Sequence, residues 1–112
     1  MKAGQMGFNP DYAEQAPTLE QVSGLSGNAV VEFGTPWCGY CQAATPAVQE
    51  VLREQSDLLH IKVYDGKGKV LGRAFRVKLW PTLILLHNGQ EVARVVRPTS
   101  ADEVRRLLAQ SQ

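Results

Sequence analysis

Between residues 37 and 41 the chain reads Trp37-Cys38-Gly39-Tyr40-Cys41, and this stretch holds the only two cysteines of the sequence. The apolar run Val30–Phe33 comes just before it and reads as a buried strand, while the residues that follow have helical spacing. Two thiols at the junction of a strand and a helix are the arrangement that thiol–disulfide exchange needs. This stretch therefore sets the expected fold and the expected chemistry together.

The spacing of the two cysteines explains the chemistry. On the first turn of a helix the two sulfurs lie one turn apart and can close a small disulfide ring. The unpaired N–H groups and the dipole at a helix N-terminus favour an anion, so we expect a lowered pKa for Cys38. Cys38 would attack a partner disulfide, and Cys41 would resolve the mixed disulfide. Trp37 would cover the site, and Tyr40 would tune it.

Other uses of two cysteines are open to the sequence. A structural disulfide with a two-residue ring constrains little of the unfolded chain and stabilises poorly. A zinc site needs four ligands, whereas the chain offers one C-x-x-C and two scattered histidines, His60 and His87. Both histidines are expected at the surface or at a strand end. Two inert buried thiols are the remaining alternative to a redox pair, and no bound metal is expected.

Composition limits the class of protein. The chain has 112 residues, 44% apolar and 21% charged, with a net charge of +1 and both signs interspersed. One domain is expected, and neither nucleic acid nor a membrane is an expected partner. The longest apolar run, Leu83–Leu86, is too short to span a bilayer. No signal peptide is recognised, which favours the cytoplasm; a removed leader would instead imply a periplasmic or secreted protein.

Periodicity and turn signals predict an α/β domain over residues 18–112, preceded by an irregular arm over residues 1–17. The arm is expected either to carry one short edge strand near residues 6–8, with Phe8 and Tyr12 docked on the body, or to fray. The central sheet is expected to be mixed, because strand–helix–strand units give parallel pairs and the Asn88-Gly89 hairpin adds an antiparallel one. Helices are expected on both faces. The expected strands are 29–33, 58–64, 83–87 and 91–96. The expected helices are 18–24, one after Cys41 to about residue 55, 70–77 and one that starts at Ser100, with capping boxes at Thr18 and Ser100. Leu19 and Ala74 are among the side chains expected to face inward.

The chain resembles thioredoxins over nearly its whole length, from about residue 18 onward. A C-x-x-C alone is a weak signal, but four features in register with the strand order make the resemblance specific. They are the motif at 37–41, Pro81 in the position of the family's cis-proline, Glu32 six residues before the first cysteine, and Pro46 five residues after the second. The resemblance implies a thioredoxin fold, with a central mixed β-sheet flanked by helices on both faces.

The resemblance also implies roles for residues outside the motif. With Pro81 cis, the backbone of Trp80 would pair with an extended substrate peptide; a trans proline at a strand entry is the alternative. Glu32 would lie beneath Cys41 and accept its proton through water, with a pKa raised by burial. Lys62 aligns with a family lysine that faces this acid. A structural Glu32–Lys62 pair, or a solvent-facing Lys62, is the alternative.

The chain departs from the usual thioredoxin pattern at several positions. Gly39-Tyr40 replaces Gly-Pro between the cysteines, which should make the couple less reducing. Gly34 stands where an aromatic residue is common, and Arg97 stands where a glycine often lets a partner approach. Trp80 is bulkier than the usual isoleucine. Together these departures indicate a specialised member of the family.

The function that the resemblance implies is reduction of protein disulfides by a monomer, through a mixed disulfide on Cys38. No cofactor is expected beyond the redox-active disulfide Cys38–Cys41, and an NADPH-dependent thioredoxin reductase is the expected electron donor. Two alternatives stay open at this point. One is a disulfide oxidase or isomerase, which Tyr40 motivates, and the other is a non-catalytic binding module that uses the apolar rim of Trp37, Tyr40 and Trp80.

Overall fold

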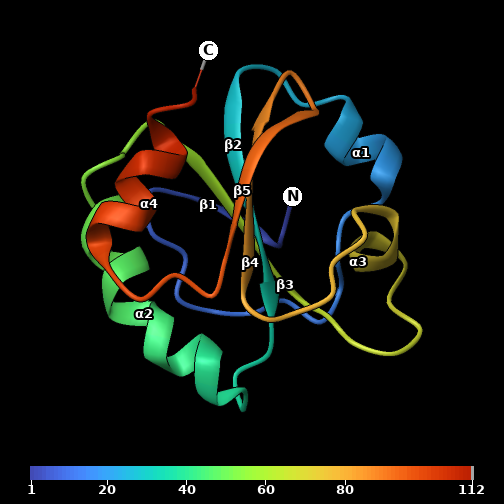
Figure 1. The fold of residues 1–112 in the computed structure, drawn as a ribbon. Helices are drawn as coiled ribbons and strands as arrows, with labels where there is room; N and C mark the ends of the chain where they lie inside the picture. Colours follow the sequence, from blue (N-terminus) through green and yellow to red (C-terminus); the bar gives the residue numbers. More distant parts are fainter. Residues whose placement is uncertain (112) are drawn as a thin grey trace.

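The computed structural model describes residues 1–111 and contains one five-stranded sheet in the order β1-β3-β2-β4-β5 (Figure 1). Four helices surround the sheet. The strands are β1 (Gly4–Met6), β2 (Asn28–Gly34), β3 (Leu59–Tyr64), β4 (Thr82–His87) and β5 (Gln90–Val96). The helices are α1 (Leu19–Ser23), α2 (Gly39–Leu52), α3 (Val70–Ala74) and α4 (Ala101–Leu108).

The sheet is mixed, as the sequence predicted. Strands β2 and β3 are parallel, because helix α2 carries the chain back between them, and all other neighbouring strands are antiparallel. The β4–β5 hairpin turns through Asn88 and Gly89, which both have positive φ. Strand β2, buried from residue 29 to residue 34, lies at the centre of the sheet and leads into the loop before the dithiol, so the central strand positions the reactive residues.

Two helix pairs cover the two faces of the sheet, as Figure 1 shows with α2 and α4 on one side and α1 and α3 on the other. Successive side chains of β2 point to opposite faces of the sheet and enter both cores, with Val30 and Glu32 facing α2 and α4. The core beneath α2 and α4 contains Val30, Val48, Val51, Leu52, Leu83, Leu85, Val104 and Leu107. The core beneath α1 and α3 contains Ala3, Val22, Val31, Phe33, Ile61, Val63, Leu71, Ile84 and Leu86.

The segment over residues 1–17 is attached to the edge of the sheet. Strand β1 pairs antiparallel with β3, and it lies two residues before the predicted edge strand. Farther on, Ala13 forms a single parallel bridge with Val63. Between these two attachments Asn9 is buried, and its side-chain amide donates to the carbonyl oxygens of Ala3 and His60. The domain boundary at residue 17 stays a prediction.

Some helix details differ from the predictions. Leu19, expected to face inward, is 47% exposed, because α1 has five residues and only Val22 reaches the sheet. Helix α2 ends at Leu52, after which i→i−3 bonds tighten the chain into a turn. Helix α3 ends at Ala74 and not near Val77, and Ala74, expected inside, is exposed. Over residues 1–111, no helix combines the length and apolar character that crossing a bilayer requires.

Candidate active site

The two thiols lie at the start of α2 and differ in accessibility. Cys38 is the N-cap residue, and its Sγ accepts a hydrogen bond from the Cys41 N–H at 3.3 Å. Both cysteines are unpaired thiols, with exposed fractions of 9% for Cys38 and 2% for Cys41. A disulfide in solution can therefore meet Cys38, whereas Cys41 lies behind it and can act on a bond that Cys38 has formed.

The environment of Cys41 keeps it protonated. Burial raises the pKa of the Cys41 thiol to about 11, and the hydrogen bond with Cys38 adds to the rise. The backbone N–H of Thr35 opposes this shift without cancelling it. Since the thiolate is the nucleophile, Cys41 needs a proton acceptor at the moment when it attacks.

An apolar rim surrounds the exposed side of the dithiol. Trp37 and Tyr40 are 64% and 59% exposed, and the rings of Trp37 and Trp80 pack edge to face with centroids 5.9 Å apart. Each indole is fixed by its N–H, which Trp37 donates to the Tyr64 hydroxyl and Trp80 donates to the Asp65 carboxylate at 2.9 Å. Trp37 and Trp80 thus pack together beside the cysteine motif, in which Gly39 and Tyr40 lie between the two thiols. Substrate binding by Trp37, Gly39, Tyr40, Trp80 and Pro81 stays a prediction.

The loop before β4 has the predicted geometry, because the Trp80–Pro81 peptide bond is cis. Arg97 bridges this loop to the cysteine motif. Its Nε donates to the Trp80 carbonyl oxygen at 2.8 Å, and its guanidinium carbon lies 3.7 Å from the centroid of the Tyr40 ring. The backbone of Arg97 is left-handed, with φ of 52°. The Arg97 side chain thus fills space that a glycine at this position would leave open.

Glu32 is buried on β2, with 1% of its surface exposed, and its carboxylate accepts two hydrogen bonds. His60 Nε2 donates to Oε1 at 2.8 Å, and the Tyr12 hydroxyl donates to Oε2 at 3.0 Å. Burial raises the pKa of the Glu32 carboxyl, but the hydrogen bond from His60, the charge of Lys62 and the hydrogen bond from Tyr12 outweigh burial. The pKa is therefore lowered, and the prediction of a raised pKa was wrong because it counted burial alone.

His60 is fully buried, so its predicted place at the surface or at a strand end was wrong. It lies on β3 opposite Val30, and its side chain therefore shares the face of Glu32. The backbone N–H of Asn9 donates to His60 Nδ1 at 2.9 Å. Since an N–H must meet an acceptor, Nδ1 is unprotonated and Nε2 carries the proton that His60 donates to Glu32. His87, by contrast, lies at the end of β4, as predicted. Its side chain contacts Asn28.

Lys62 lies directly beside Glu32 in the parallel register of β2 and β3. Its side chain is 3% exposed, which excludes a solvent-facing lysine. Its Nζ donates to the Pro10 carbonyl oxygen at 3.1 Å and lies 4.4 Å from the centroid of the Tyr12 ring. No direct Glu32–Lys62 ion pair forms among the residues that the structure describes. Lys62 acts on the acid through its field, and its catalytic role stays a prediction.

Tyr12 is a site residue to which the sequence assigned only a docking role. Its hydroxyl donates to Glu32 and lies beside the Cys41 thiol at Gly34, so it connects the resolving cysteine to the buried acid. Gly34 makes this possible, because a Cβ at that position would lie 2.6 Å from Cys41 Sγ and 2.7 Å from the Tyr12 hydroxyl. The ring of Tyr12 fills the space beside Gly34.

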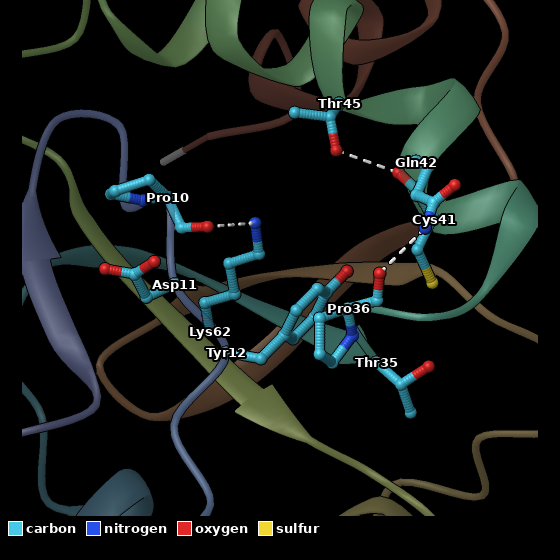
Figure 2. Close-up of a pocket in the computed structure, with 9 residues that line it drawn as sticks. All are labelled: Pro10, Asp11, Tyr12, Thr35, Pro36, Cys41, Gln42, Thr45 and Lys62. Atoms are coloured by element: carbon cyan, nitrogen blue, oxygen red, sulfur yellow. Dashed lines mark hydrogen bonds between the residues drawn. The ribbon is translucent and has the colours of Figure 1, made fainter.

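A pocket of about 330 Å³ opens next to this group of residues (Figure 2). Figure 2 shows Lys62 reaching toward Pro10 and the Tyr12 hydroxyl pointing toward the Cys41 side of the pocket. The pocket is lined by Pro10, Asp11, Tyr12, Thr35, Pro36, Cys41, Gln42, Thr45 and Lys62. Within residues 1–111 no cluster of three or more histidine, cysteine or acidic side chains could hold a metal ion.

Comparison with known proteins agrees with this geometry. The family model described as Thioredoxin matches residues 13–110, which include the dithiol, Glu32 and the cis-proline. The chain belongs to the thioredoxin family. Among solved thioredoxin structures, the reduced form of thioredoxin 2 from Pseudomonas aeruginosa PAO1 is 46% identical, with a TM-score of 0.81. That match covers 92% of this chain and 96% of the Pseudomonas aeruginosa chain.

Two further relatives are thioredoxins by name. The thioredoxin of Chlamydia caviae is 34% identical over 85 residues, which are 76% of this chain and 83% of that protein. The bifunctional thioredoxin reductase/thioredoxin of Mycobacterium leprae is 36% identical over 75 residues, which are 64% of this chain and 16% of that protein. With its dithiol in this setting, the protein is a thiol–disulfide oxidoreductase of the thioredoxin family that reduces protein disulfides.

Proposed function

We propose that this thioredoxin-family protein acts as a monomer in the cytoplasm, on a restricted set of partner proteins, and receives its electrons from NADPH through a thioredoxin reductase. The difference between the two thiols carries the proposal. Cys38 is the more exposed thiol and is placed to attack a partner disulfide. Cys41 is buried behind Cys38 and has a pKa of about 11. The bifunctional relative from Mycobacterium leprae, which joins both proteins in one chain, supports a reductase as donor.

The restricted partner range rests on Arg97. An extended peptide that pairs with the backbone of Trp80 would meet a carbonyl oxygen that already accepts from Arg97. The guanidinium also places a positive charge beside the exposed ring of Tyr40. A partner with an acidic side chain near its disulfide would gain from this charge, and a partner with a basic one would be repelled.

The experiment couples insulin reduction to NADPH oxidation by a bacterial thioredoxin reductase. We expect NADPH consumption with the unaltered protein and none with Cys38→Ser. Cys41→Ser should trap a substrate as a stable mixed disulfide on Cys38. The reduction potential of the dithiol, measured in glutathione or dithiothreitol buffers, should lie closer to about −270 mV than to about −120 mV.

Other outcomes would replace this proposal. A potential near the oxidising end, together with no electron transfer from the reductase, would make the protein an oxidase or isomerase. If Cys38→Ser kept the full biological activity, the fold would serve as a binding module.

A further inference from the structure

A continuous set of polar contacts runs from the resolving cysteine into the sheet. Cys41 contacts the Tyr12 hydroxyl, Tyr12 donates to Glu32 Oε2, and His60 donates to Glu32 Oε1. The set ends at the backbone N–H of Asn9, which donates to His60. These groups come from helix α2, strands β2 and β3, and the N-terminal segment, so the tertiary fold and not local sequence assembles them.

The hydroxyl of Tyr12 is suited to pass a proton on without keeping a charge. Burial raises the pKa of Tyr12 far above its ordinary value, and the nearby Glu32 and Cys41 raise it further. Tyr12 therefore stays neutral, and it can accept one proton on its oxygen only while it gives another away. Its two neighbours in the set are a thiol and a carboxylate, which are the donor and the acceptor that such a transfer requires.

We propose that Tyr12 is a catalytic residue that transfers the proton of the Cys41 thiol to Glu32 as Cys41 attacks the mixed disulfide. His60 is a positioning residue, since it acts through Glu32. The proposal rests on the proposed function, because it concerns the second step of the same disulfide reduction. It replaces water, the carrier expected from the sequence, by a side chain of the N-terminal segment.

Protons and electrons are conserved in this step. Cys41 Sγ attacks Cys38 Sγ, its proton passes to the Tyr12 oxygen, and the Tyr12 hydroxyl proton passes to Glu32 Oε2. The Cys38–Cys41 bond forms while the bond from Cys38 to the partner sulfur breaks, and the electron pair leaves on the partner thiolate. The partner has gained two electrons from the dithiol, Tyr12 is neutral again, and Glu32 holds the proton. Reduction of the new disulfide returns that proton by the reverse path.

The surroundings explain why the transfer accompanies bond formation and does not precede it. The pKa of Cys41 is raised and that of Glu32 is lowered, so a free Cys41 thiolate beside a protonated Glu32 is unfavourable at rest. When Cys41 becomes part of a disulfide, its sulfur no longer needs the proton and the balance moves toward Glu32. The other titratable groups that face this path are Cys38 before α2, His60 and Lys62 on β3, and Asp11 at the pocket.

His60 limits where the proton can go. Because Asn9 donates to Nδ1, the imidazole already has its proton on Nε2, and a second proton would place two donors face to face. His60 therefore remains a donor to Oε1 throughout, which leaves Oε2 as the oxygen that receives the proton from Tyr12. The pocket lined by Tyr12, Cys41 and Lys62 gives this region a route to solvent, through which the proton can exchange between cycles.

The test separates the two chemical steps in one stopped-flow trace. The reduced protein, in excess, is mixed with 5,5′-dithiobis(2-nitrobenzoate). Attack by Cys38 releases the first nitrothiobenzoate, and attack by Cys41 on the mixed disulfide releases the second. With Tyr12→Phe we expect the first release to stay within about twofold of the unaltered protein, and the second to slow roughly 10- to 100-fold at pH 7.

The pH profile distinguishes proton transfer from a merely structural role. In Tyr12→Phe the second rate should rise with pH, nearly tenfold per unit, because only the thiolate formed in bulk equilibrium reacts. The unaltered protein should show a shallow profile between pH 6 and 9. Tyr64→Phe, which removes an aromatic hydroxyl bonded to Trp37, serves as the matched control and should keep the shallow profile in the second release.

A double-mutant cycle completes the test. Glu32→Gln should slow the second release as Tyr12→Phe does, and the combined variant should be no slower than the slower single variant, since both interrupt one path. Additive losses, or a Tyr12→Phe profile as shallow as that of the unaltered protein, would overturn the proposal. Failure of the proposed function would look different, because the unaltered protein would then fail to turn over insulin.

Discussion

Arg97 offers a test in which contacts and backbone conformation can be separated. Replacing Arg97 by alanine removes the hydrogen bond to the Trp80 carbonyl and the packing on Tyr40, but keeps a Cβ on a left-handed residue with φ of 52°. Replacing it by glycine removes the same contacts and also relieves the left-handed conformation. The two variants therefore differ in one physical effect.

The magnitudes follow from the geometry. A half-buried hydrogen bond from a charged donor contributes about 1.5 kcal/mol, and a cation–π contact near the surface contributes about 0.5–1 kcal/mol. Arg97→Ala should therefore lower the free energy of unfolding by about 2–2.5 kcal/mol. A left-handed residue with a Cβ costs about 1–2 kcal/mol relative to glycine. Arg97→Gly should recover roughly 1 kcal/mol of the loss and be the more stable of the two variants.

Urea unfolding of the reduced proteins measures the difference. With the slope usual for a small protein, a gap of roughly 1 kcal/mol separates the two midpoints by about 0.3–1 M urea. Equal midpoints for the alanine and glycine variants would refute the left-handed backbone at residue 97. An alanine variant as stable as the unaltered protein would refute the bridge between Trp80 and Tyr40. The same proteins also test specificity, since loss of Arg97 should reduce the preference for partners with acidic flanks.

Three further predictions concern the buried site. Because the folded-state pKa of Glu32 lies below its ordinary value, its stabilisation is present above about pH 4.5 and is lost as pH falls through the folded value. Glu32→Gln should thus flatten the loss of stability on acidification in urea titrations at pH 3–7, and an unchanged slope would contradict the assignment. The raised pKa of Cys41 predicts that the reduced protein loses stability as pH rises from 9.0 to about 11. Cys41→Ala should remove this part of the alkaline loss, and a loss of equal size in that variant would assign it to other groups. Gly34→Ala would insert a Cβ between Cys41 and the Tyr12 hydroxyl, so we expect destabilisation of about 1–3 kcal/mol in thermal unfolding and a slower second thiol release. Unaltered kinetics in Gly34→Ala would show that Tyr12 need not contact Cys41.

The sequence was sufficient for the fold and for the dithiol. The C-x-x-C motif, the Asn88-Gly89 turn and the capping box at Thr18 are local signals, and the structure has each of these features where it was predicted. Ser100 caps its helix as predicted, but the Glu103 side chain accepts from the Thr99 N–H and not from Ser100, so the second capping box is incomplete. The short helices were predicted less well. In α1 and α3 five residues are too few for periodicity to show which side chain faces inward, and Leu19 and Ala74 were assigned to the wrong side.

The buried polar set could not be read from the sequence, because Tyr12, His60 and Asn9 are distant in the chain from Cys41 and belong to no motif. Tyr12 and Asn9 precede the match to the family model, which begins at residue 13. His60 looked like a lone strand histidine until the register of β2 and β3 placed it on the face of Glu32. The pKa of Glu32 was predicted in the wrong direction for the same reason, since its hydrogen-bond donors were unknown.

The contacts that Asn9 and Tyr12 make with His60 and Cys41 have a consequence for how the protein can be truncated. A proteolytic cut after Tyr12 would leave the whole family-matched region and both cysteines in one piece, yet release the hydroxyl that contacts Cys41 and the amide that orients His60. Such a fragment would keep the motif and form mixed disulfides through Cys38, but would release the reduced partner slowly. In this protein the ability to finish a reaction cycle is encoded at a distance of some thirty residues from the cysteines that begin it.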